Sequence, residues 1–173
     1  MEIRDASEND GAACAAIYEP YVRDTAITFE TVPPTAAEMS GRIARSLRDH
    51  AWVVAQEGSA VVGYAYGGLY KERAAYAWAC EVSVYLQLDL RRTGLGRALY
   101  RELFARLAGR GYLTAVAGTT LPNPASEGLH RAMGFQPAGT YRRIGFKHGA
   151  WHDVMWTQRD LVDPRPDEPG PLR

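Results

Sequence analysis

The sequence lacks the features that would direct the chain into a membrane or along the secretory route. No apolar run approaches the roughly 20 residues that a membrane-spanning helix needs. The first residues, Met1 to Asp5, hold no apolar stretch of the kind found in signal peptides. The two cysteines, Cys14 and Cys80, are too few for a disulfide framework. These shortages together favour a cytoplasmic protein with no membrane association.

An excess of charge of either sign is also missing. The 20 basic and 20 acidic residues give a formal net charge of zero. Proteins that bind nucleic acid neutralise phosphates with surplus Lys and Arg, so nucleic acid is not an expected partner. The chain has 173 residues, of which 46% are hydrophobic, and this suits one globular domain. We expect that domain at 1–162, followed by a Pro-rich tail at 163–173 that is flexible or loosely docked.

Strand and helix signals alternate along the expected domain. Strands are predicted at 2–5, 51–55, 60–66, 75–86 and 113–119, with a final hairpin that joins 136–146 to 151–159. Four helices are predicted: one capped by Asp10, one that opens with a capping box at Thr35 and runs to about Arg48, and two more at 94–107 and 124–133. This interleaving predicts a mixed α/β sheet with helices on its faces.

The sharpest local motif is a glycine-containing loop just before the helix at 94–107. It reads Arg91-Arg92-Thr93-Gly94-Leu95-Gly96, and Arg97 follows. Free N–H groups and the dipole at the start of a helix attract anions, and glycine lets the main chain approach a phosphate closely. The dinucleotide fingerprint fails because Leu99 occupies its third small position, and a P-loop fails because no Gly-Lys-Ser/Thr is present. A helix start that binds no ligand remains the alternative.

The pattern Arg/Gln-x-x-Gly-x-Gly/Ala resembles the pyrophosphate loop of GNAT acetyltransferases. Other blocks resemble phosphinothricin N-acetyltransferases of that superfamily: the run from Tyr70 to Tyr85, Leu121-Pro122-Asn123, Leu129-His130, Gly145-Phe146-Lys147-His148-Gly149 and Trp151-His152-Asp153-Val154. The resemblance covers about residues 2 to 160. It implies the GNAT fold, in which a mixed, mostly antiparallel sheet of about seven strands carries helices on both faces. Departures at Leu69, Ala77, Cys80 and 86–90 leave the exact substrate open.

The resemblance further implies acetyl-CoA as cosubstrate, no metal and a homodimer. The strand that ends at 84–86 splays from its neighbour in GNAT folds, and its exposed backbone pairs with pantetheine. The cofactor-binding residues implied in this way are Val84, Tyr85, Leu86, Arg91, Arg92, Thr93, Gly94, Leu95, Gly96, Arg97 and Asn123. Asn123 also follows a strand and begins a helix, where it would serve as an N-cap.

Glu81 and His130 are the candidate catalytic residues. Glu81 is the only charged residue between Ala74 and Leu88, and burial among apolar neighbours would raise its pKa and improve it as a base. The matching family glutamate is a base that acts through water, whereas an ordinary solvent-facing acid is the alternative. His130 titrates near neutrality. The family histidine at this position implies a catalytic or orienting role, against the alternative of a half-exposed helix residue.

Acceptor binding is assigned to Phe29, Lys71, Arg73 and Tyr76. Lys71 and Arg73 offer two cations that suit an anionic amino acid, with an exposed charged loop as the alternative. The predicted function is acetyl transfer to the amino group of a phosphinothricin, methionine sulfoximine or methionine sulfone type of molecule. A GNAT enzyme for a polyamine, drug or peptide N-terminus, and a silent acyl-CoA-binding module, remain open. Trp151 and Trp156 are interpreted as core or dimer contacts, and Cys80 as packing.

Overall fold

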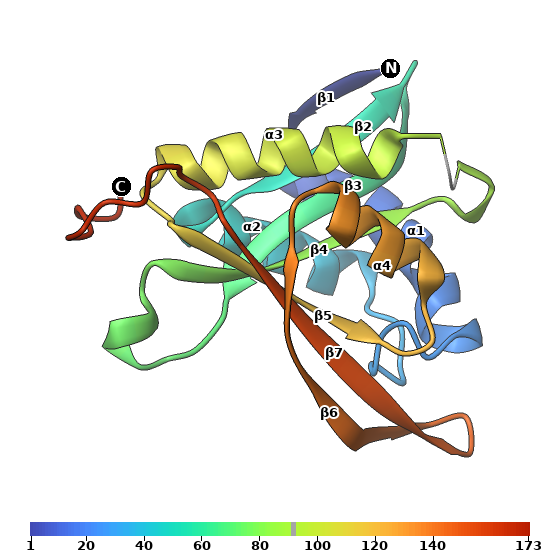
Figure 1. Ribbon diagram of the computed structural model, residues 1–173. Helices are drawn as coiled ribbons and strands as arrows, with labels where there is room; N and C mark the ends of the chain where they lie inside the picture. The colour runs from blue at the N-terminus through green and yellow to red at the C-terminus, as the bar shows by residue number, and fades with distance from the viewer. Residues whose placement is uncertain (91–92) are drawn as a thin grey trace.

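A seven-stranded sheet forms the centre of the protein in the computed structural model, which describes residues 1–90 and 93–173. The strand order is β1-β2-β3-β4-β5-β7-β6 (Figure 1). The strands are β1 (Glu2–Asp5), β2 (Trp52–Glu57), β3 (Ala60–Leu69), β4 (Ala79–Leu86), β5 (Thr114–Thr120), β6 (Gln136–Lys147) and β7 (Ala150–Asp160). In the described part of the chain only β4 and β5 pair in parallel. The predicted mixed, mostly antiparallel sheet is confirmed.

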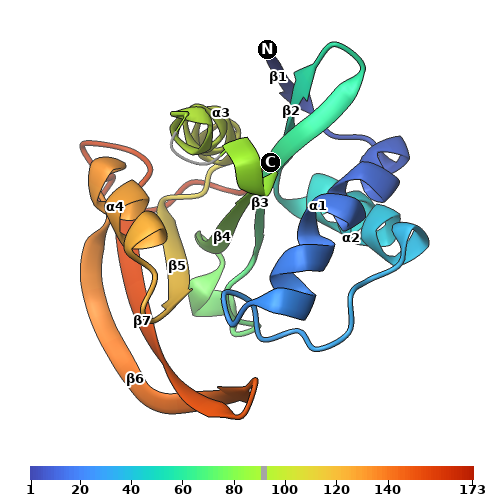
Figure 2. The same ribbon diagram turned by 90° about the vertical axis from the view of Figure 1, so that its right-hand side faces the viewer.

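Helices cover both faces of the sheet, as the sequence predicts. Figure 2 shows α1 (Gly11–Asp24) and α2 (Ala36–Asp49) on one face, and α3 (Leu95–Gly109) and α4 (Pro124–Ala132) on the other. Each face has its own apolar core. The repeated leucines of α3, including Leu99 and Leu103, are fully buried against one face, and Ile17 and Tyr21 of α1 pack on the other. None of the described helices is long and apolar enough to cross a bilayer.

Two helix starts show how local chemistry sets the boundaries. The capping box predicted for α2 is present: Thr35 Oγ1 accepts from the Glu38 amide at 3.2 Å, and Glu38 Oε2 accepts from the Thr35 amide at 2.7 Å. Asp10, by contrast, does not cap α1 with its side chain. Its carboxylate accepts from the Ser7 amide at 2.8 Å and from both Arg4 guanidinium nitrogens, because a short 3-10 turn at Glu8–Asp10 precedes the helix.

The central strand begins four residues later than predicted. Ala74–Tyr76 is a 3-10 turn, and β4 starts at Ala79. A short run of alanines and aromatics is compatible with either conformation, so periodicity alone does not place this boundary. The result is an exposed loop from residue 70 to 78, and this loop carries three of the predicted acceptor-binding residues.

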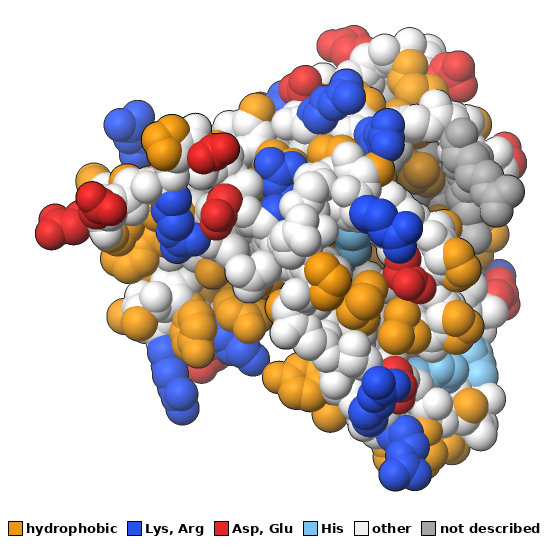
Figure 3. Space-filling view, viewed as in Figure 1, with side chains coloured by type: hydrophobic (Ala, Val, Ile, Leu, Met, Phe, Trp, Pro, Cys, Tyr) orange, Lys and Arg blue, Asp and Glu red, His pale blue; other side chains and the backbone are white. Residues whose placement is uncertain are grey.

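On the face shown in Figure 3, acidic and basic side chains are interspersed, in line with the zero net charge of the whole chain. The segment 163–173 contacts the body near α3: Trp78 Nε1 donates to the Gly170 carbonyl at 2.7 Å, and the Arg173 amide donates to the Arg110 carbonyl at 2.9 Å.

Candidate active site

The sheet opens into a fork between β4 and β5. The two strands pair at only three positions, the last of which joins Glu81 to Val116. Beyond that pair β4 runs on to Leu86 and β5 to Thr120 without pairing with each other. Main-chain groups along the inner edges of such a fork are available to an extended ligand.

A continuous cleft follows the fork. A cavity of about 460 Å³ lies at its start and is lined by residues that include Phe29, Glu81 and Trp156; we call it the acceptor cavity because Phe29 is a predicted acceptor-binding residue. A narrow cavity of about 50 Å³ shares Ser83 and Tyr85 with it. A long cavity of about 650 Å³ shares Asn123 with the narrow one and reaches the start of α3. One crevice therefore leads from the carboxylate of Glu81 to the glycine loop.

Glu81 lies on β4 at the inner end of this cleft. Burial raises the pKa of its carboxyl group, and the positive charge of Lys71 partly offsets that shift. Among the described residues no side-chain hydrogen bond to this carboxylate is present, and Glu81 lines the acceptor cavity. A carboxylate with a raised pKa in a cleft is well suited to accept a proton near neutral pH.

The described part of the glycine loop has local features that favour an anion. Gly94 adopts φ +86 at the N-cap of α3, a left-handed conformation that favours glycine. The first N–H groups of a helix have no intrahelical partner, and no side chain caps this one. Gly96 and Arg97 line the long cavity. Thr93 Oγ1 donates to the Leu90 carbonyl at 2.8 Å, and Leu95 turns its side chain into the core.

Arg91 and Arg92, two predicted members of this loop, lie outside the described residues. The predicted strand residues Val84 and Leu86 line the long cavity, and Tyr85 lines the acceptor and narrow cavities. The Tyr85 ring also packs edge-on against α1, 4.8 Å from the Tyr18 ring centroid.

Asn123 forms the N-cap of α4, because its Oδ1 accepts from the Ser126 amide at 3.2 Å. It also lines both the narrow and the long cavity. The two interpretations of this residue, as a helix cap and as a cleft residue, are therefore compatible in the structure.

His130 is buried beneath the narrow cavity, with 5% of its surface exposed. Its Nε2 lies 3.4 Å from the Tyr100 hydroxyl, and its Nδ1 lies 3.4 Å from Thr119 Oγ1 and 3.5 Å from Thr157 Oγ1. Thr157 Oγ1 also donates to the Ala117 carbonyl at 3.4 Å. Burial lowers the pKa of His130 to about 4, and the ring is neutral at pH 7.

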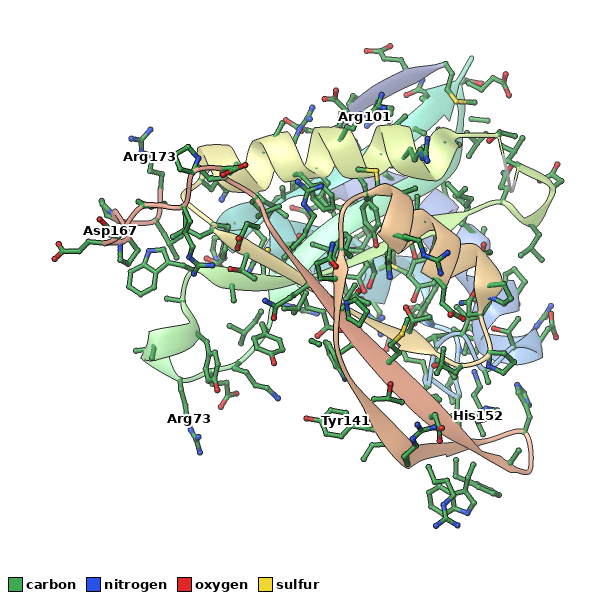
Figure 4. All side chains as sticks on the ribbon, in the orientation of Figure 1. Arg73, Arg101, Tyr141, His152, Asp167 and Arg173 are labelled. Carbon is green, nitrogen blue, oxygen red and sulfur yellow. The ribbon has the colours of Figure 1, made fainter. Side chains whose placement is uncertain are left out.

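The predicted acceptor-binding residues are distributed over two places. Phe29 lines the acceptor cavity. Lys71, Arg73 and Tyr76 lie on the exposed loop at 70–78, outside the lining of that cavity, and Figure 4 shows Arg73 pointing away from the body. The positive charge of Lys71 lowers the pKa of Glu81, and the Lys71 Nζ lies 5.3 Å from the Tyr70 ring centroid.

Sequence reasoning missed most of the walls of the acceptor cavity. They are Tyr18, Ile27, Thr28, Glu30, Tyr66, Ser83, Gly118, Thr120, Tyr141, Ile144, Val154 and Trp156. Trp156 was predicted as a core or dimer residue, but it lies over Gly118 at the cavity wall because that glycine leaves room for the indole. The aromatic character of this wall is a signal that the sequence does contain, although the sequence does not show which aromatic residues converge.

Three further residues with reactive or metal-ligating side chains have ordinary contacts. Cys80 is fully buried and burial raises the pKa of its thiol to about 12, which confirms a packing role. His148 and His152 lie in the turn and strand of the β6–β7 hairpin, and His152 Nε2 donates to the Lys147 carbonyl at 3.0 Å. Among the described residues no group of three or more His, Cys, Asp or Glu side chains could hold a metal ion.

Proteins of a known family match this chain over nearly its whole length. The family model of the acetyltransferase (GNAT) domain matches residues 3–156. The phosphinothricin N-acetyltransferase of Streptomyces viridochromogenes is 39% identical over 169 residues, or 98% of this chain and 92% of that protein. The L-methionine sulfoximine/L-methionine sulfone acetyltransferase of Pseudomonas paraeruginosa is 35% identical over 169 residues, or 96% of this chain and 98% of that protein.

A solved structure places a ligand in the same fold. The GNAT superfamily phosphinothricin acetyltransferase of Sinorhizobium meliloti, in complex with AcCoA, superposes with a TM-score of 0.92 at 36% identity, over 98% of this chain and 92% of that one. The forked sheet, the glycine loop and the cleft between them are thus set in a sequence that matches this family over nearly its whole length. The chain belongs to the GNAT superfamily, in the phosphinothricin and methionine sulfoximine N-acetyltransferase family, and is an acetyl-CoA-dependent N-acetyltransferase.

Proposed function

We propose that the protein acetylates the amino group of a small amino acid of the phosphinothricin, methionine sulfoximine or methionine sulfone type. The observation that carries this proposal is the continuous cleft, because it joins a carboxylate with a raised pKa to a phosphate-type loop through a gap in the sheet. The names of relatives at 35–39% identity supply the class of acceptor.

In the proposed reaction the acetyl group passes directly from sulfur to nitrogen. Glu81 accepts a proton from the substrate ammonium group through water, which leaves a nucleophilic amine. The amine attacks the thioester carbonyl, an N–C bond forms, and the C–S bond breaks. Backbone N–H groups of β4 stabilise the negative charge on the carbonyl oxygen. The nitrogen then loses its second proton to the departing thiolate, and the protonated Glu81 returns the first proton to solvent, which restores the carboxylate.

His130 orients the site in this proposal and does not supply a proton from an imidazolium. Its pKa of about 4 leaves the ring neutral at physiological pH, and both ring nitrogens face buried hydroxyl groups. The ring packs against Tyr100 and Phe135, with centroids 6.0 and 4.9 Å away. This support fixes the narrow part of the cleft, which His130 lines together with Ser83 and Tyr100.

The acceptor is anionic in this proposal because Lys71 places a positive charge close enough to influence Glu81. Arg73 lies two residues further along the same exposed loop and would join it once a carboxylate or phosphinate is present. The aromatic walls of the cavity would pack against the aliphatic part of the substrate.

Thiol release from acetyl-CoA tests the proposal. Phosphinothricin, methionine sulfoximine and methionine sulfone should each support release, whereas spermidine and a peptide N-terminus should not. Release with the cationic amines alone would favour another GNAT activity, and no release with any amine would favour a silent acyl-CoA-binding module. Lys71→Glu should raise KM for the amino acids and leave KM for acetyl-CoA unchanged.

We also propose that the protein acts as a cytoplasmic homodimer. Tyr141, Ile144, Phe146 and Trp151 expose apolar side chains on the β6–β7 hairpin, which projects from the body in Figure 1. Such a patch favours burial against a second copy. Sedimentation at micromolar concentration should give twice the mass of 19.1 kDa, and Trp151→Glu should shift the protein toward the monomer. A wild-type protein that sediments as a monomer would contradict the dimer.

A further inference from the structure

The motif Gly145-Phe146-Lys147-His148-Gly149 has no part in the proposed reaction, yet the structure gives it a defined geometry. It forms the end of β6 and the turn into β7. His148 and Gly149 have φ values of 51 and 76, which is the arrangement of a two-residue hairpin loop with both central residues left-handed. Lys147 and Ala150 pair across this loop. The tight turn fixes the direction in which the Lys147 side chain leaves the strand.

Lys147 does not point into solvent. Only 5% of the residue is exposed, whereas Lys71, the only other lysine of the chain, lies on a surface loop. The Lys147 Nζ donates to the Val22 carbonyl at 2.7 Å and to the Thr28 carbonyl at 2.8 Å. Val22 lies in the last turn of α1, where carbonyls lack intrahelical partners and a positive charge is favourable. One ammonium group thus joins the end of α1 to the segment that follows it.

Two more contacts hold the same segment, which spans residues 25–30. His148 Nε2 lies 3.2 Å from the Thr25 carbonyl, which accepts its proton. Gly145 lies against the Phe29 ring so closely that a Cβ at this position would overlap three ring atoms. Both views of the ribbon show the hairpin tip beside the chain that leaves α1 (Figures 1 and 2). The motif therefore contacts this segment at three points.

The segment 25–30 is also a wall of the acceptor cavity. Ile27, Thr28, Phe29 and Glu30 all line it. The side chains of this wall are further ordered by Tyr18, whose hydroxyl lies 2.6 Å from Thr28 Oγ1 and donates to Glu30 Oε1 at 3.0 Å. Arg42 binds both oxygens of Glu30 at 2.6 and 2.9 Å. The side chains are thus held from α1 and α2, and the main chain of the segment is held from the hairpin.

We propose that the Gly145–Gly149 motif is a clamp that fixes this wall, and that Lys147 is a positioning residue for recognition of the acceptor. The proposal rests on the proposed function only in assigning the acceptor amine to this cavity. Lys147 itself touches neither the fork nor the glycine loop, and the segment that it holds gives four residues to the acceptor cavity but only Ile27 to the long cavity, so its effect on acceptor binding exceeds its effect on donor binding. Burial lowers the pKa of Lys147, which agrees with an ammonium group held by main-chain carbonyls alone.

Lys147→Met tests the clamp because it keeps an unbranched side chain only one atom shorter and removes the donors. Hydrogen exchange of the amides at 25–30 should accelerate at least tenfold, while exchange in α3 stays unchanged. KM for the amino acid should rise about tenfold, with KM for acetyl-CoA within twofold of wild type. Unchanged exchange at 25–30, or equal increases in both KM values, would overturn the proposal. The exchange experiment decides the matter even if no amine proves to be a substrate.

A pair of glycine variants covers the case in which Lys147→Met does not fold. Gly145→Ala should displace the Phe29 ring and raise KM for the amino acid, because the added methyl group occupies the space of that ring. Gly139→Ala on the same strand is the matched control, since its Cβ would meet nothing within 4 Å. Equal acceptor KM values for the two variants would contradict a role for the contact with Phe29.

Discussion

Replacement of Glu81 by glutamine should remove most of the turnover without loss of donor binding. A positioned general base contributes about 10²–10⁴-fold to a rate. The acceptor cavity of about 460 Å³ has room for water, which occupies roughly 30 Å³ per molecule, beside a small amino acid. A glutamine can still hold that water without taking its proton. We therefore expect a loss of about 10²–10³-fold in kcat, or about 3–4 kcal/mol in activation free energy.

The same variant should be more stable than the wild-type protein at alkaline pH. Burial raises the folded-state pKa of Glu81 above its ordinary value of 4.5, so the folded state binds the proton more tightly than the unfolded state. The free energy of unfolding therefore falls as pH rises from 4.5 through the folded-state pKa, and the full penalty is present above that pKa. Glu81→Gln removes the penalty, and its advantage in stability should be larger at pH 8 than at pH 4.

Steady-state kinetics, acetyl-CoA titration by calorimetry and chemical denaturation at the two pH values measure these effects. Glu81→Asp is the control, because it retains a carboxylate but withdraws it from the cavity. The reasoning fails if Glu81→Gln turns over at the wild-type rate, and it also fails if the variant loses its affinity for acetyl-CoA. A variant without activity that gains no stability at pH 8 would show that the carboxylate is less buried than the structure indicates.

Three further predictions concern the rest of the molecule. Between pH 6 and 8 the rate profile should show no inflection from His130, because burial lowers its pKa to about 4. A folded-state pKa of about 4 instead of 6.5 lowers the free energy of unfolding of the wild-type protein by up to about 3 kcal/mol in acid, so His130→Gln should lose less of that free energy as pH falls from 6.5 to 4.5. Equal losses on acid denaturation would contradict this. Gly94→Ala should lower the free energy of unfolding by about 1–2 kcal/mol, because φ +86 is strained for alanine. The same substitution should raise KM for acetyl-CoA with little effect on KM for the amine. Denaturation measures the first effect and steady-state kinetics the second. Leu103→Ala, at a fully buried position of α3, should lower the free energy of unfolding by about 2–5 kcal/mol in urea titrations, whereas truncation of the exposed Leu88 should cost far less.

Short-range chemistry made much of the fold predictable. The capping box at Thr35 and the leucine repeat of α3 depend on residues three or four apart, and both occur as predicted. The start of β4 was misplaced because Ala74 to Trp78 suit either a strand or a turn, and Asp10 was misassigned because its partner Arg4 belongs to a different element.

The candidate site divides in the same way. The glycine loop and Glu81 could be predicted because each stands out within a short stretch of sequence. Tyr18, Tyr66 and Trp156 could not, since they come from a helix and two strands that meet only after folding. The low pKa of His130 was also out of reach, because it depends on burial beneath Tyr100 and Phe135.

The early parting of β4 and β5 has a mechanical consequence. Within the described residues, only three residue pairs join β4 to β5, and these pairs hold together the half of the sheet that ends with β4 and the half that begins with β5. A ligand that binds along the fork would contact both halves of the sheet and stabilise their relative arrangement. By mass action a ligand at 100 times its Kd adds about 2.7 kcal/mol to the free energy of unfolding. The concentration of the donor would thus set the resistance of the enzyme to unfolding as well as its rate.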